Sequence, residues 1–412
     1  MQPLENFVKS ARIFLDSKAE KRDERLASAQ AVEDRVALFR GSTEQEVAVA
    51  RAWQRSAFDA GFGWISGPAD EGGAGLSGRY ERAYLALERE YDVASRGPLS
   101  VSLGMVAPTL LQYGSDEVRA QWLKPLRRGD AVGCQLFSEP GAGSDLAGVT
   151  TAAIQGVDGN WVLDGQKVWT SGAHYSDIGV ALTRTAPGPR HKNLTAFVVD
   201  MRDPGVEVRP LRQMTGGADF NEVFLSGARV PDTNRLGEVG SGWTVALAML
   251  SHERNAIGGA STGGTGLFKM EALSAWLREI GRADDPAVAQ AFARVYCGVT
   301  AAKGMRARAE ARAKAGELPG PEMSLGKLAL TNNLTALSDL VMLALGSRGL
   351  ADTGEIRTFA WTEFVLGVPG MRIGGGTDEI QRNIIAERVL GLPKDPVQPG
   401  RSNEEQGKHD AF

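Results

Sequence analysis

The chain has 412 residues, of which 42% are hydrophobic and 23% charged, and its formal net charge is −4. This composition is typical of a soluble globular protein, and the length indicates several domains, at about one per 100–200 residues. The acidic balance and the lack of a basic stripe argue against nucleic acid as a partner. Two cysteines and four dispersed histidines indicate neither a disulfide framework nor a protein-ligated metal.

Membrane and export signals are not expected. No apolar run reaches the roughly 18–20 residues that a membrane span needs. The first residues have no basic segment followed by an apolar core, as a secretory signal would. These features predict a cytoplasmic protein.

Residues 3–128 have the apolar spacing of helices, with one buried stripe through Val49, Ala50, Trp53 and Ala57. The pattern shortens between residues 130 and 231, where turn sequences such as Asp164-Gly165 separate short β-rich runs. We expect strands at 132–137, 160–163, 168–170, 178–182, 194–199, 206–208 and 223–225.

The helical spacing returns after residue 240. We expect one long helix over 243–280, others over 286–316 and 323–345, and a last helix beginning at the N-cap Thr377. The sequence therefore predicts an α+β multi-domain protein. Its parts are an N-terminal all-α domain (1–129), a central small β-barrel or sandwich (130–234), a C-terminal four-helix bundle (235–393) and a mobile tail (394–412).

Two short motifs imitate functional signatures. Residues 73–78 fit GxGxxG, but the preceding Ser66-Gly67-Pro68 indicates a loop, whereas a dinucleotide fingerprint follows a strand. Residues 259–263 fit GxSxG, but they fall in a predicted helix, and the only later histidine is His409. An acyl hydrolase is therefore a poor alternative.

The glycines of that second segment still need an explanation, because glycine weakens a helix interior. They are Gly258, Gly259, Gly263, Gly264 and Gly266. Two readings are open: close helix packing, or a wall kept small so that a bulky ligand can lie against it.

Three longer motifs are more specific. Residues 137–145 read FSEPGAGSD, residues 167–172 read KVWTSG, and residues 374–388 read GGGTDEIQRNIIAER. Together they resemble the acyl-CoA dehydrogenase family in order and spacing, over roughly residues 45–393. The resemblance implies FAD as cofactor, an acyl-CoA substrate, an electron-transferring flavoprotein as partner, and assembly as a homotetramer or a heteromer with a related subunit.

The resemblance also implies positions for the flavin. The backbones of Phe137 and Ser138 would meet its pyrimidine side, and Trp169 with Ser171 would lie near the dimethylbenzene ring and N5. The implied cofactor-binding residues are Gln135, Phe137, Ser138, Gly143, Ser144, Trp169, Ser171, Thr377 and Glu379. The implied substrate-binding residues are Ser144, Ser251, Arg254 and Gly376.

The catalytic base differs from the commonest family pattern. Dehydrogenation of an acyl thioester removes an α-proton while the β-hydride leaves, so the site needs a base and a polarised carbonyl. Many members have a Glu where this chain has Gly375. Isovaleryl-type members have a Glu-Arg pair in the first helix of the last bundle, which here is Glu253-Arg254. The resemblance thus implies that Glu253 is the base, that Arg254 organises it, and that the Gly375 N–H binds the thioester carbonyl.

Two family features are missing. The R-K-x-F-G stretch, whose Arg reaches a neighbouring subunit's flavin, is replaced by GRADDP at 281–286. The Q-x-x-G-G-x-G stretch becomes LALGSRG at 343–349. Three alternatives are open: a partner chain supplies those groups in a heteromeric dehydrogenase, Arg282 or Arg348 compensates, or the flavin binds more weakly.

The resulting hypothesis is FAD-dependent α,β-dehydrogenation of an acyl-CoA, with a branched or bulky acyl group, to the 2-enoyl-CoA. Two alternatives stay open: a flavin monooxygenase or oxidase on the same scaffold, and a non-catalytic subunit of a heteromeric dehydrogenase.

Overall fold

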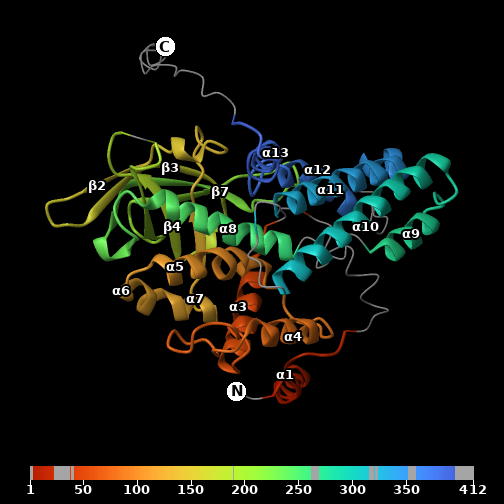
Figure 1. Ribbon diagram of the computed structural model, residues 1–412, viewed down its shortest axis with the longest axis horizontal. Helices are drawn as coiled ribbons and strands as arrows, with labels where there is room; N and C mark the ends of the chain where they lie inside the picture. Colours follow the sequence, from red (N-terminus) through yellow and green to blue (C-terminus); the bar gives the residue numbers. More distant parts are fainter. Residues whose placement is uncertain are drawn as a thin grey trace, which may run out of the picture.

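The computed structural model describes residues 3–22, 38, 41–188, 190–260, 269–314, 320, 323–350 and 359–394. The N-terminal helices lie below the rest of the molecule (Figure 1). They are α1 (Leu4–Lys18), α3 (Glu44–Asp59), α4 (Gly78–Glu88), α5 (Ala107–Tyr113), α6 (Asp116–Val118) and α7 (Lys124–Arg128). A capping box starts α3: Thr43 Oγ1 accepts a hydrogen bond from the Glu46 N–H, and the Glu46 carboxylate accepts one from the Thr43 N–H. Residues 73–77 form a loop that leads into α4, which begins at Gly78, so the predicted loop is confirmed for this motif.

The strands form one eight-stranded sheet in the order β6-β7-β3-β2-β4-β5-β8, with β1 parallel to β4. They are β1 (Gly133–Leu136), β2 (Ala152–Gln155), β3 (Trp161–Ser171), β4 (Ile178–Arg184), β5 (Leu194–Asp200), β6 (Val206–Pro210), β7 (Phe220–Val230) and β8 (Arg235–Leu236). Strands β2 and β8 were not predicted.

The prediction of separate strands at 160–163 and 168–170 is wrong, because both belong to β3. The turn expected at Asp164-Gly165 is instead a bulge against β7. Gly165 has φ +155°, and a Cβ there would lie 2.5 Å from Thr151 Oγ1. A close approach between neighbouring chain segments, and not a turn, therefore requires this glycine.

The C-terminal helices form a bundle beside the sheet (Figure 1). They are α8 (Gly242–Ala260), α9 (Met270–Glu279), α10 (Pro286–Lys314), α11 (Met323–Leu345), α12 (Phe359–Met371) and α13 (Asp378–Ile384). The single helix expected over 243–280 is wrong, since α8 and α9 are separate helices. Helix α12 was not predicted. Residues 261–268, which include part of the GxSxG segment, and residues 395–412 of the expected tail lie outside the described residues.

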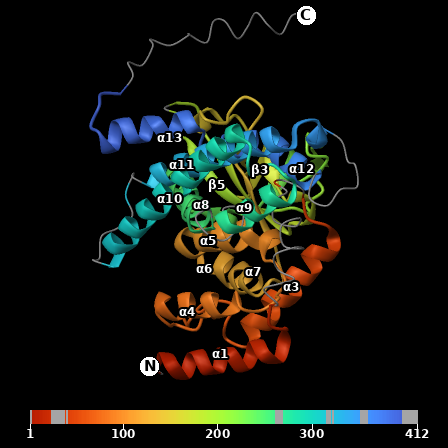
Figure 2. The same cartoon turned by 90° about the vertical axis from the view of Figure 1, so that its right-hand side faces the viewer.

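Helix α11 with the turn after it, residues 323–350, is long and apolar enough to cross a membrane. Half of its most apolar window is buried in the bundle, however, as in the core helix of a water-soluble protein. The view in Figure 2 shows α10 and α11 lying above the N-terminal helices.

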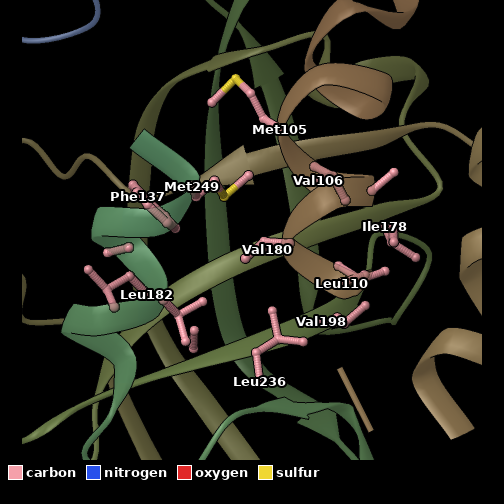
Figure 3. Packing of buried hydrophobic residues seen from close by; sticks show 14 of the residues in the cluster. Met105, Val106, Leu110, Phe137, Ile178, Val180, Leu182, Val198, Leu236 and Met249 are labelled. Carbon is pink, nitrogen blue, oxygen red and sulfur yellow. The ribbon is translucent and has the colours of Figure 1, made fainter. Parts of the chain in front are cut away.

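One core joins all three parts and fixes the position of α8. Met249 of α8 packs with Met105 and Val106, which precede α5, and with Val180 and Val198 of the sheet (Figure 3). All of these side chains are at most 6% exposed. Because α8 packs against both the sheet and the N-terminal helices, the end of α8 that carries Glu253 is held next to the bundle.

Candidate active site

The FSEPGAGSD segment is a turn that begins where β1 ends. Phe137 is buried, Ser138 is half-buried, and Gly143 and Ser144 are exposed. Added Cβ atoms at Gly141 and Gly143 would meet nothing within 4 Å. The turn therefore presents open backbone to any ligand that lies against it.

Glu139 holds this turn in place. Its Oε2 accepts from the Thr150 N–H at 2.6 Å and its Oε1 from the Thr151 N–H at 2.9 Å. Oε1 also accepts from Lys167 Nζ of β3 at 2.8 Å. Burial alone would raise the pKa of Glu139, but the Lys167 charge and these hydrogen bonds outweigh it and hold the pKa well below its usual range. The Glu139 carboxylate is thus ionised, and both of its oxygens accept hydrogen bonds within the protein.

Lys167 is completely buried, which is rare for a lysine. Besides Glu139, its Nζ donates to the carbonyl oxygens of Phe137 at 3.1 Å and Leu182 at 2.6 Å. One ammonium therefore ties the turn to β3 and β4. The sequence analysis assigned no role to Glu139 or Lys167, although both lie inside the motifs that carry the resemblance.

Trp169 stands two residues further along β3 and has an unusual backbone. Its φ of +61° makes it the one residue other than glycine with positive φ in the described part of the chain. The bulge between Lys167 and Thr170 puts it in this conformation. Its side chain is 61% exposed and meets the Phe220 ring edge-on at 5.9 Å. Positive φ is costly for a bulky residue, so the fold maintains an exposed indole at a strained position.

The residues around this indole fit a flavin. The neighbouring Val168 N–H donates to the Ser138 carbonyl at 2.9 Å, so the Phe137–Ser138 turn lies directly beside the Trp169 bulge. Buried polar atoms without a hydrogen-bond partner among the described residues lie nearby, on Gln135 Nε2 and Thr170 Oγ1. An exposed aromatic face, an open glycine turn and unsatisfied donors are what a planar polar ring requires.

Ser171 is half-buried one residue further on. It lines a cavity of about 120 Å³ together with Tyr175 and Asp219. Burial raises the pKa of Asp219 above its ordinary value. This small polar cavity adjoins the end of β3 and is distinct from the open surface at Trp169.

A second part of the site is the glycine turn between α12 and α13. Gly375 and Gly376 have φ of +68° and +86°. Gln381 Nε2 donates to the Gly375 carbonyl at 3.0 Å, and Lys327 Nζ donates to the Gly376 carbonyl at 3.2 Å. Within the described residues, the Gly375 and Gly376 N–H groups make no hydrogen bond. The turn is therefore held by its carbonyl oxygens, which leaves two N–H donors available.

Glu253 lies on α8 and is half-buried. Burial lowers the pKa of Lys327, and the negative charges of Asp378 and Glu253 oppose that effect. Lys327 also binds the Gly376 carbonyl, beside the predicted carbonyl donor. Ser251 is exposed on α8. Arg254 is also on α8, but its side chain lies outside the described residues.

Thr377 caps α13 as predicted, with its Oγ1 accepting from the Ile380 N–H at 3.2 Å. Glu379 is exposed in the first turn, where a backbone N–H and the Thr377 hydroxyl lower its pKa. Its Oε1 accepts from Arg382 Nη1 at 3.3 Å. The structure thus keeps Thr377 next to the glycine turn, and Glu379 on the outer side of the helix.

Arg282 is already engaged within its own segment. It forms an ion pair with Asp285 at 2.9 Å and donates to the Leu343 carbonyl at 3.3 Å. Both contacts use Arg282 Nη2, while its buried Nε has no hydrogen-bond partner among the described residues.

The comparisons with known proteins agree with this arrangement. Residues 8–130, 134–227 and 240–390 match the N-terminal, middle and C-terminal domains of acyl-CoA dehydrogenase. The chain belongs to the acyl-CoA dehydrogenase family, whose members are FAD-dependent oxidoreductases that act on acyl-CoA. The predicted fold class and cofactor are therefore confirmed.

Among the relatives is the acyl-CoA dehydrogenase IpdE1 of Mycobacterium tuberculosis, 38% identical over 353 residues, which are 84% of this chain and 88% of that protein. The solved Tcur3481-Tcur3483 steroid ACAD is 25% identical, with a TM-score of 0.76 over 96% of this chain and 99% of that one. The ChsE4-ChsE5 complex from Mycobacterium tuberculosis is also 25% identical, with a TM-score of 0.71 over the same shares.

Proposed function

We propose that this protein oxidises a bulky acyl-CoA thioester to the 2-enoyl-CoA, with Glu253 as the base. In this reaction the Glu253 carboxylate takes the α-proton, the β C–H bond breaks with loss of a hydride, and a double bond forms between the two carbons. Bound FAD supplies the acceptor for the hydride and its two electrons. The observation that supports the proposal is that Lys327 contacts the glycine turn and acts electrostatically on Glu253.

Residues of this chain would bind the thioester, the flavin and the rest of the substrate. The free Gly375 N–H would donate to the thioester carbonyl and stabilise the negative charge that develops on its oxygen. Trp169, Ser138 and the open turn at Gly143 would hold the flavin and exclude water from one of its faces. Ser251, Arg254 and Gly376 would line the substrate, and Thr377 with Glu379 would lie toward the adenosine end.

The preference for a bulky acyl group is supported by two features. The base is placed on α8, as in isovaleryl-type members, and one similar solved protein is described as a steroid ACAD. A large ring system or a branched chain is therefore the class of substrate to test first.

We also propose that the active assembly contains a second, related subunit. The family's R-K-x-F-G stretch and its Q-x-x-G-G-x-G stretch are both replaced in this chain, and Arg282 Nη2 is engaged locally with Asp285, so a related subunit would supply groups for the far end of the cofactor. Two similar structures bear names that join two proteins. The homotetramer is the competing arrangement. An electron-transferring flavoprotein as acceptor and a cytoplasmic location complete the proposal.

The direct test is an anaerobic panel of acyl-CoA esters, from straight-chain to branched and polycyclic, mixed with the FAD-loaded protein. We expect bleaching of the visible flavin band and an enoyl-CoA product two mass units lighter with the bulky esters. No bleaching by any ester, together with rapid peroxide formation or hydroxylation once reduced flavin meets oxygen, would support the oxidase or monooxygenase alternative.

The subunit question has its own test. Flavin content and molecular mass are measured for this chain expressed alone and with a related gene product from the same source. Full flavin occupancy in a homotetramer of this chain alone would contradict the heteromer. Flavin retained only in the mixed assembly is the expected result.

A further inference from the structure

Lys327 is an unusual residue for its place in the fold. It lies on α11 in a run of apolar residues, and only 9% of it is exposed. Its Nζ donates to two backbone carbonyls, of Met371 at 3.0 Å and Gly376 at 3.2 Å. These two oxygens stand at the start and the end of the segment that joins α12 to α13. A single ammonium therefore closes that segment into a loop.

We propose that Lys327 is a positioning residue for the reaction, which closes the segment between α12 and α13 and thereby holds the glycine turn, with its Gly375 N–H donor, in one conformation. This inference rests on the proposed function, since it names how the carbonyl donor of that reaction is held in place. Lys327 itself touches neither substrate nor reacting atoms in this account.

The hydrogen bonds around the turn support this role. With Lys327 on the Gly376 carbonyl and Gln381 on the Gly375 carbonyl, both oxygens face the bundle. These bonds fix the peptide planes on either side of Gly376, and the bond from Lys327 to the Met371 carbonyl fixes the start of the segment, so Gly375 is held from both sides. Two glycines with positive φ would otherwise have wide conformational freedom.

The negative charges around Lys327 favour the ammonium form that its bonds to the two carbonyls require. Asp378 on α13, Arg372 in the turn and Glu253 on α8 act on it. The Asp378 carboxylate already accepts from Thr331 Oγ1 at 2.9 Å and from Arg372 Nε at 2.8 Å. Burial lowers the pKa of Lys327, while the charges of Asp378 and Glu253 oppose that effect.

The test uses the FAD-loaded full chain, in its complete assembly, with three variants. Lys327→Met removes the donor and the charge. Lys327→Gln removes the charge and shortens the donor, so it no longer reaches both carbonyls. Lys303→Met is the control, since Lys303 is exposed on α10. Hydrogen–deuterium exchange of the backbone at 372–378 is measured without substrate, and kcat and KM are measured with the best ester of the panel.

We expect exchange at 372–378 to rise about tenfold in Lys327→Met and less in Lys327→Gln, because local opening becomes easier. The kcat should fall at least about tenfold in Lys327→Met, with a smaller change in KM, since the polarised carbonyl belongs to the transition state. Lys303→Met should match the wild type in every measurement.

Wild-type exchange in both Lys327 variants, or an unchanged kcat in Lys327→Met, overturns the inference. Should Lys327→Met not fold, Lys327→Gln carries both measurements. The exchange result does not depend on the identity of the base. A wrong assignment of Glu253 would show separately, as near-normal turnover in Glu253→Gln, and would leave the effect of Lys327 on the turn to be decided by exchange.

Discussion

Lys167 Nζ lies 2.8 Å from Glu139 Oε1, and both side chains are buried between β3 and the turn that follows β1. This ion pair joins the two segments that the resemblance assigns to the flavin. Its loss would affect both the stability of the β domain and the geometry of the cofactor site.

Lys167→Met should be strongly destabilising. It leaves the Glu139 carboxylate buried without its counter-ion and two carbonyls without a donor, which costs about 3–5 kcal/mol. Urea unfolding measures the loss. Adding Glu139→Gln removes the unpaired charge, so the double variant should regain part of the lost unfolding free energy. The surface variant Lys192→Met should unfold like the wild type, and equal effects of the two lysine changes would contradict this account.

The contribution of Glu139 should depend on pH in a defined direction. Its pKa is lowered in the folded protein, so its ionised form contributes stability at neutral pH. That contribution is complete above the ordinary carboxyl range and is lost as the pH falls from about 4.5 toward the lower folded value. The difference in unfolding free energy between wild type and Glu139→Gln should shrink over that range, measured at pH 7, 4 and 3. A difference that stays constant from pH 7 to pH 3 would show that the ionised Glu139–Lys167 pair does not contribute this stability.

Trp169→Gly should separate stability from cofactor binding. Glycine relieves the positive φ at this position, which is worth about 1–2 kcal/mol, and little buried surface is lost because the indole is 61% exposed. The flavin-free protein should therefore be at least as stable as the wild type, while FAD dissociates at least about tenfold more readily. Trp169→Phe should keep the strain and bind FAD with intermediate affinity. A destabilised flavin-free protein with normal FAD affinity would contradict the proposed stacking role.

The glycine turn offers a pair of matched changes. Gly375 has φ +68°, so Gly375→Ala adds a side chain in a strained conformation and should lower kcat/KM at least about tenfold. Gly374 does not have positive φ, and a Cβ there would lie 3.8 Å from the nearest atom, the Gly370 oxygen. Gly374→Ala should therefore leave kcat/KM within about threefold of the wild type. Equal loss in both variants would mean that bulk near the turn, and not its conformation, limits the reaction.

The sequence predicted correctly those features that are determined by a few consecutive residues. The Thr377 cap and the FSEPGAGSD turn are local, and the structure places them as predicted. The continuity of β3 was missed, because the requirement at Gly165 comes from Thr151 on a neighbouring part of the chain. Helix α12 was missed because it is nearly all apolar and contains Pro369, which leaves no helical periodicity to detect.

The polar groups that hold the site could not be predicted from spacing alone. Lys327 binds Met371 and Gly376, 44 and 49 residues away in the sequence. A weak signal existed, because Lys327 and Asp339 are the only charged residues between Met323 and Leu345. A lone lysine in an apolar helix indicates a buried partner, but only the packing of α11 against α13 shows which partner it is.

The proposed reaction requires the Glu253 carboxylate on α8 to remove the α-proton, and the Glu253→Gln variant is the decisive test of this step. The FAD-loaded variant and wild type are mixed anaerobically with the best ester of the panel, and the rate of flavin bleaching is followed, with Glu271→Gln on the exposed face of α9 as control. We predict normal flavin content and ester binding in Glu253→Gln with bleaching slower by about 10²–10⁴-fold, the usual contribution of a general base. Bleaching at a near-normal rate in that variant would contradict the account.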